Sequence, residues 1–66
     1  MKFIKLTSVE TGNIMFINVE QIIDFYSVKG KSIITWTNTP DFEVKETSEE
    51  ILEKINDCIK ETNKNL

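Results

Sequence analysis

Few side chains in this sequence are suited to acid–base chemistry. The chain contains no histidine, the residue used most often as a general acid or base, and carboxylates can replace it only where burial drives two pKa values apart. Asp24 and Glu43 lie in segments expected to form strands and could approach each other in the fold. Residues of this kind are more often solvated surface charges, so we expect no acid–base site.

Nucleophilic catalysis and metal binding are disfavoured for related reasons. Cys58 is the only cysteine, and without a histidine neither an activated thiol nor a zinc site of the usual Cys/His type is expected. We expect Cys58 to be a small, buried and inert side chain on the apolar side of a helix. Gly12 and Gly30 stand singly in turns, so no phosphate-binding loop is predicted. These patterns predict a non-enzymatic protein with no metal and no cofactor.

Charge and composition disfavour two further classes of partner. Eight lysines face eleven acidic residues, with no arginine, and the formal charge is −3. Binding of nucleic acid is not expected, because phosphate contact needs concentrated positive charge. Trp36 and Tyr26 could stack on single-stranded bases, but Trp36 shares a strand face with Ile34 and is expected in the core.

No apolar run approaches the roughly 20 residues that cross a bilayer, so no membrane insertion is expected. No segment has the pattern of a signal peptide, and a lone cysteine is typical of a reducing compartment. We therefore expect a cytoplasmic protein.

The length predicts a single domain, residues 1–66, with a thin core. Scaffolds below about 70 to 80 residues rarely gain more than about 3 to 5 kcal/mol from one core, and many are braced by disulfides, metals or oligomerisation. Since an intrachain disulfide is impossible and a Cys/His zinc site is not expected, oligomerisation is the brace that remains. We expect a protein partner or self-association as a homo-oligomer.

Apolar alternation predicts a sheet within residues 1–46. Strands are expected over residues 1–7, 14–17, 22–28, 32–37 and 42–45. Asn18 is expected to cap a single helical turn, and Gly12-Asn13 suits the positive-φ positions of a hairpin. Pro40 cannot donate to a ladder and is placed in the connection 38–41. The predicted fold class is α+β: a four- to five-stranded antiparallel meander sheet with one C-terminal amphipathic helix packed on one face.

The helix has the sharpest local signal. Thr47 and Glu50 are predicted to form a capping box, in which the Thr47 hydroxyl accepts a backbone N–H of the first turn and the Glu50 carboxylate accepts the backbone N–H of Thr47. The helix is predicted over residues 47–62, with a frayed tail at 63–66. Its apolar stripe, spaced by three and four, contains Ile51, Leu52, Ile55, Cys58 and Ile59.

The pleat divides the apolar strand residues between two faces. The set expected to face the helix is Ile4, Leu6, Met15, Ile17, Ile34, Trp36, Phe42 and Val44. The opposite face then carries Phe3, Ile14, Phe16 and Ile33. A contiguous apolar patch on a small domain marks a protein contact, so these four residues are the candidate interaction face. The alternative, that they are scattered or covered by lysine stems, stays open.

Several short motifs follow one another in an order that resembles the FlbD-like flagellar and swarming motility proteins. They are Ile4-Lys5-Leu6-Thr7, Thr11-Gly12, Ile17-Asn18, Ile22, Ile34-Thr35-Trp36-Thr37-Asn38 and Val44-Lys45-Glu46-Thr47, with Glu50-Ile51 and Ile55. The resemblance covers residues 1 to about 60, and Val44-Lys45-Glu46-Thr47 is its most specific part. The family pattern has an Asn-Gly turn before the last strand, where this chain has Asn38-Thr39-Pro40-Asp41. The resemblance implies a small cytoplasmic accessory or regulatory protein without catalytic residues.

Two interpretations of function follow. The first is a non-enzymatic protein-interaction or regulatory module of the FlbD-like kind. The alternative is a phage or mobile-element protein that binds a host protein or a small ligand to inhibit or sequester it. The flanking genes would distinguish them.

Overall fold

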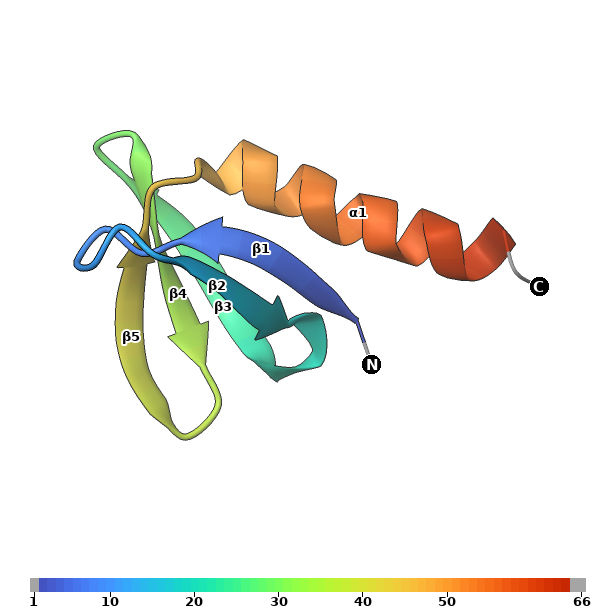
Figure 1. Cartoon of the computed structure of the whole chain (residues 1–66), viewed down its shortest axis with the longest axis horizontal. Helices are drawn as coiled ribbons and strands as arrows, with labels where there is room; N and C mark the ends of the chain where they lie inside the picture. The colour runs from blue at the N-terminus through green and yellow to red at the C-terminus, as the bar shows by residue number, and fades with distance from the viewer. Residues whose placement is uncertain (1, 65–66) are drawn as a thin grey trace.

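The computed structural model describes the backbone of residues 2–64 and the side chains of residues 2–60. Its elements, in chain order, are β1 (Phe3–Thr7), β2 (Ile14–Asn18), the 3₁₀ turn η1 (Val19–Gln21), β3 (Ile22–Val28), β4 (Lys31–Trp36), β5 (Thr39–Val44) and α1 (Ser48–Lys64) (Figure 1). The predicted α+β class and the order of five strands and a C-terminal helix are confirmed. Residues 63 and 64 of the predicted tail belong to α1, and residues 65 and 66 lie outside the described part. Within that part, no helix is long and apolar enough to cross a membrane.

The strands form two antiparallel sheets, so the prediction of one meander sheet is wrong. β1 pairs with β2, whereas β3, β4 and β5 form a separate three-stranded sheet. The η1 turn redirects the chain between β2 and β3, which therefore do not pair. Asn18 Oδ1 accepts a hydrogen bond from the Glu20 N–H at 3.0 Å, so the predicted cap of this turn is confirmed.

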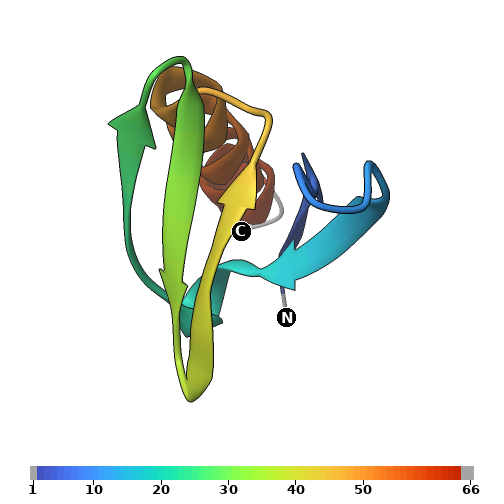
Figure 2. The ribbon, with the colours of Figure 1, turned by 90° about the vertical axis from the view of Figure 1, so that its left-hand side faces the viewer.

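The end of β1 joins the two sheets. Ser8 forms an antiparallel bridge with Val44. The Lys45 N–H donates to the Thr7 carbonyl at 2.9 Å, and the Val9 N–H donates to the Glu43 carbonyl at 3.1 Å. The C-terminal part of β5 is thus paired on both sides. Figure 2 shows the β1–β2 hairpin standing at an angle beside the three-stranded sheet, with the helix behind.

Two hairpin turns in the three-stranded sheet use positive φ angles. Lys29 and Gly30, with φ of 50° and 81°, connect the paired residues Val28 and Lys31. Positive φ at both central residues is the type I′ geometry, which matches the twist of the strands. Asn38, with φ of 58°, lies in the turn between β4 and β5.

β5 begins at Thr39 rather than at Phe42, and it therefore contains Pro40. The register with β4 shifts between the pairs Ile34–Phe42 and Trp36–Thr39. Proline is tolerated at such an irregularity and on an edge strand, where its missing N–H breaks no ladder bond. Pro40 therefore lies within β5, and the prediction that it lies in the connection 38–41 is wrong.

The capping box of α1 is present. The Glu50 N–H donates to Thr47 Oγ1 at 3.2 Å, and the Thr47 N–H donates to Glu50 Oε1 at 3.3 Å. Just before it, Glu46 accepts hydrogen bonds from the Thr7 N–H at 2.8 Å and from Thr7 Oγ1 at 2.9 Å. These bonds fix the start of the helix against the end of β1.

The core lies between the two sheets and α1. Its buried side chains are Ile4, Leu6, Ile17, Ile34, Val44 and Ile51. The remaining residues predicted to face the helix, Met15, Trp36 and Phe42, are partly buried against this cluster. α1 packs on β1 and β3, across the junction of the two sheets rather than on one face of a single sheet.

The helix stripe is narrower than predicted, because the helix spans this junction and extends past the strands (Figure 1). Ile51 is buried, and Ile55 and Cys58 are half-buried against the core. Leu52 and Ile59 are 52% and 46% exposed.

Candidate functional site

Three large apolar side chains lie exposed on the outer side of the β1–β2 hairpin. Phe3 is 48% exposed, Ile14 63% and Phe16 64%. Lys5 pairs with Phe16 and Thr7 with Ile14, and alternation along the two strands sends these side chains away from the core. Phe3, Ile14 and Phe16 are hereafter called the hairpin face.

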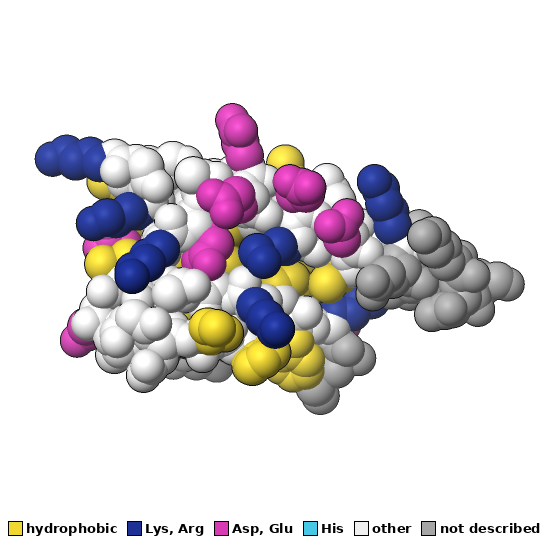
Figure 3. All heavy atoms as spheres, turned by 45° about the horizontal axis from the view of Figure 1, so that its top comes forward, with side chains coloured by type: hydrophobic (Ala, Val, Ile, Leu, Met, Phe, Trp, Pro, Cys, Tyr) yellow, Lys and Arg dark blue, Asp and Glu magenta, His cyan; other side chains and the backbone are white. Residues whose placement is uncertain are grey.

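A lysine covers part of the hairpin face. Lys5 Nζ lies 5.7 Å from the centroid of the Phe16 ring. A cation–π contact at an exposed position contributes about 0.5 to 1 kcal/mol. The Lys5 stem shields Phe16 only in part, since the ring stays largely exposed. Figure 3 shows hydrophobic side chains interrupted by lysines over the hairpin, and acidic side chains along the solvent side of α1.

Ile33, the fourth residue of the predicted face, lies in the other sheet. It is half-buried on β4, between its cross-strand partners Tyr26 and Glu43. The structure therefore places Phe3, Ile14 and Phe16 on one hairpin and does not add Ile33 to it. The reason is the division into two sheets, which turns the outer side of β4 in a different direction from that of β2.

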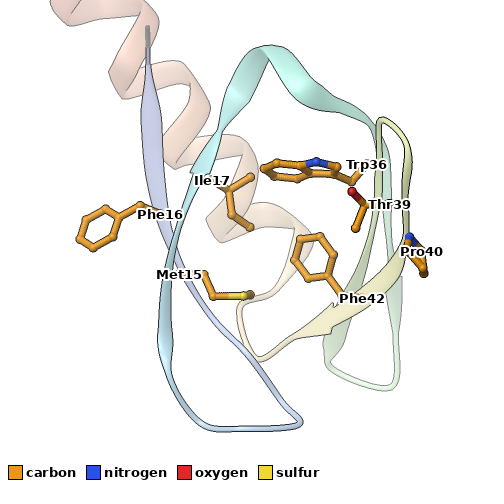
Figure 4. A pocket seen from close by; sticks show the side chains of 7 residues that line it. All are labelled: Met15, Phe16, Ile17, Trp36, Thr39, Pro40 and Phe42. Carbon is orange, nitrogen blue, oxygen red and sulfur yellow. The ribbon is translucent and has the colours of Figure 1, made fainter.

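An apolar groove of about 400 Å³ opens between β2 and β5. Its lining residues are Met15, Phe16, Ile17, Trp36, Thr39, Pro40 and Phe42. Figure 4 shows Met15 and Ile17 pointing from β2 toward Trp36 and Phe42, while the Phe16 ring points away. The rings of Trp36 and Phe42 meet edge to face, with centroids 5.9 Å apart. β2 thus contributes side chains to two surfaces, the hairpin face outside and the groove inside.

A second cavity, of about 280 Å³, shares Phe42 with this groove. Three carboxylates line it, those of Glu10, Asp41 and Glu43. None of the three forms an ion pair with a lysine of the described residues. We call these three residues the acidic rim. An apolar groove and a negatively charged cavity are therefore adjacent.

The residues considered for catalysis are not brought together. Asp24 lies on β3 and Glu43 on β5, and β4 separates these strands. Cys58 is half-buried against the core, and its Sγ lies 3.7 Å from the carbonyl oxygen of Phe3. Among the described residues, no group of three or more His, Cys, Asp or Glu side chains is arranged to hold a metal ion.

The groove and the acidic rim were not predicted from the sequence. In a single meander sheet, Met15 and Phe42 would be covered on the side that faces the helix. They line an opening instead, because the hairpin and the three-stranded sheet diverge at this end. The local signals for the groove were the aromatic residues Trp36 and Phe42 on either side of a turn. No local signal places β2 opposite them.

Searches of protein-family models, of curated proteins and of solved structures find no match to this chain. What the hairpin face and the groove can bind therefore has to be derived from their geometry and charge.

Proposed function

We propose that this chain is a non-enzymatic protein-interaction module that docks onto another protein, or onto a second copy of itself, through the hairpin face. The observation that carries the proposal is the exposure of Phe3, Ile14 and Phe16 side by side on one hairpin. Large aromatic side chains supply most of the energy of protein contacts when they become buried at the centre of an interface.

The size of the hairpin face fits the centre of an interface. At about 150 to 250 Å² for a large side chain, its three residues expose roughly 300 Å² of mostly apolar surface. Patches of about 300 to 600 Å² on monomeric proteins are often functional. A standard interface buries about 800 Å² on each partner, so the surrounding polar residues of the hairpin would form the rim.

The test is a comparison of three tagged full-length chains in a lysate of the native host. The first is the unchanged protein, and the second carries Ile14→Thr and Phe16→Ser. The third carries Leu52→Ser and Ile59→Ser on α1, a matched control because these residues are exposed to a similar degree. Circular dichroism establishes that all three fold.

We expect a defined protein to be retained by the unchanged chain and by the helix control, and to be lost with the hairpin variant. Sedimentation equilibrium of the same three chains tests the form in which a second copy is the partner. Retention of the same proteins by all three chains would contradict the proposal. So would a monomer mass at every concentration together with no captured protein.

The process that the module serves is also a proposal. The resemblance to FlbD-like proteins favours an accessory or regulatory role in motility. The alternative, a phage or mobile-element protein that sequesters a host protein or a small ligand, receives some support from the apolar groove, whose volume lies within the about 300 to 1,000 Å³ of small-molecule sites. Flagellar genes beside the coding sequence would support the first role, and phage genes the second.

A further inference from the structure

The groove is bordered by strand edges with unused backbone groups. The Val19 N–H bonds to the Lys2 carbonyl, which makes Phe3–Asn18 a non-hydrogen-bonded pair of the antiparallel ladder. Such pairs alternate with hydrogen-bonded ones, so Lys5–Phe16 is non-hydrogen-bonded as well. The N–H and C=O of Phe16 therefore point away from β1, toward the groove. An edge of this kind can accept an added strand.

The opposite border is the first half of β5. Its second half is paired with the end of β1: the Val9 N–H donates to the Glu43 carbonyl, and Ser8 forms a bridge with Val44. In the described part of the chain, residues 39–41 of β5 have no strand beside them on that edge. Pro40 and the turn residue Asn38 keep this border irregular. The two borders leave an apolar floor of Met15, Trp36 and Phe42 between them.

Charge decides what kind of chain fits this groove. Glu10, Asp41 and Glu43 line the cavity that shares Phe42 with the groove, and none of them forms an ion pair with a described lysine. The whole chain carries a formal charge of −3. A second copy would bring the same three carboxylates and the same net charge to the contact, whereas a basic segment would be complementary to both.

We infer that the groove binds an extended peptide segment of a partner protein that presents one bulky apolar side chain to Met15, Trp36 and Phe42, and a lysine or arginine to the acidic rim. The segment lies along the β2 edge and bonds to the backbone of Phe16. On β5 Phe42 faces the groove, whereas Asp41 and Glu43 on either side of it face the other way. The apolar and basic side chains of the segment therefore point to opposite sides and belong to neighbouring residues. The partner motif is therefore a bulky apolar residue and a basic residue in such spacing. This inference rests on the proposed function and specifies the partner.

Trp36 makes the groove directly observable. It is the only tryptophan of the chain and is part of the groove floor. The emission of this single residue therefore reports whether the groove is occupied, provided that the added peptide contains no tryptophan. Selection of random heptapeptides on the immobilised full chain supplies the probes, and synthetic copies of the enriched peptides are titrated against the protein in solution.

We expect enriched peptides to combine a bulky apolar residue with a lysine or arginine at a neighbouring position, and to shift the Trp36 emission on binding. Asp41→Asn with Glu43→Gln is expected to weaken binding about fivefold to tenfold at low ionic strength, and less at high ionic strength, because exposed charge pairs are weak and screened by salt. The control is Glu53→Gln with Asp57→Asn, which removes the same charge from the solvent side of α1. It should leave the affinity unchanged.

Four results would overturn the inference. They are an absence of enriched peptides, enrichment without a basic residue, equal affinity of the rim variant and the control, and a Trp36 emission that shifts with protein concentration alone. The last result would identify a second copy as the occupant. A host protein captured through the hairpin face alongside any of them would leave the proposed function standing. If peptides bind at the groove but capture of the host protein does not depend on Ile14 and Phe16, the inference stands and the proposed function fails.

Discussion

The Ser48 hydroxyl contacts two other serine hydroxyls where α1 meets the three-stranded sheet. Ser27 Oγ donates to Ser48 Oγ at 2.7 Å, and Ser32 Oγ lies 3.1 Å from the same atom. Ser32 is fully buried, whereas Ser27 is exposed. The two hydroxyls therefore depend on Ser48 to different degrees. A buried hydroxyl that loses its partner keeps its desolvation penalty, but an exposed one turns to water.

Ser48→Ala is expected to lower the free energy of unfolding by about 1 to 3 kcal/mol, because it leaves the Ser32 hydroxyl without a hydrogen bond. Urea denaturation followed by circular dichroism measures the change. Ser27→Ala is the control and should cost less than about 0.5 kcal/mol. Ser32→Ala combined with Ser48→Ala should cost less than the sum of the single changes. Equal effects of Ser48→Ala and Ser27→Ala would show that the buried hydroxyl does not depend on Ser48.

The start of α1 and the turn between β3 and β4 are each fixed by local interactions that are visible in the sequence. The capping box begins α1, and the two-residue turn at Lys29 and Gly30 closes the β3–β4 hairpin. The two features differ in how well their residues suit the local backbone conformation. The cap has its preferred residues, but Lys29 holds a positive φ that asparagine or glycine adopts more readily.

Thr47→Ala is expected to cost about 0.5 to 2 kcal/mol, because the hydroxyl that accepts the Glu50 N–H is lost. For a domain of this size the melting temperature should fall by about 4 to 8 °C for each kcal/mol. Glu53→Gln, in the middle of the exposed helix face, serves as the control with little effect. An unchanged melting temperature for Thr47→Ala would mean that tertiary packing alone fixes the helix start.

Lys29→Asn is expected to stabilise the protein by about 0.5 to 1 kcal/mol, since it creates the Asn-Gly sequence that type I′ turns prefer. Thermal unfolding measures the gain. Lys31→Asn removes the same charge from a strand position next to the turn and should give no gain. A matching gain from both variants would attribute the effect to charge rather than to backbone conformation.

The sequence predicts elements better than their arrangement, for physical reasons. Strand alternation and the capping box depend on residues close in sequence, and they were predicted within a few residues. The division into two sheets depends on the pairing of Ser8 with Val44 and on the helix lying across β1 and β3. Pro40 was misplaced because its tolerance depends on an irregular register with β4. The groove could not be predicted from the sequence either, because its walls come from two different sheets.

At the scale of the whole molecule, six buried side chains hold two sheets and a helix together. Such a core gives a chain of this length only a few kcal/mol of net stability. Leu6 is central to it: the residue is fully buried on β1, the strand that contacts β2, the end of β5 and α1.

Leu6→Ala is expected to cost about 2 to 5 kcal/mol through lost burial and a residual cavity, which is comparable to the total stability. The variant should be largely unfolded at 25 °C by circular dichroism and by loss of amide dispersion in NMR spectra. Leu52→Ala, on the exposed side of α1, should change stability by about 0.5 kcal/mol or less. A folded Leu6→Ala protein with near-normal stability would show that the hairpin contributes little to the fold.

The contact between Lys5 and Phe16 also bears on how concentrated this protein can become. β2 begins with a run of four apolar residues, Ile14 to Ile17, and carries no charged side chain. Its outer edge is open, and segments of this composition seed fibrils when chains crowd together. Lys5 places a positive charge over this strand, with its Nζ above the Phe16 ring. Mutual repulsion between these lysines would oppose stacking of one hairpin on the next, so we expect Lys5 to slow fibril growth.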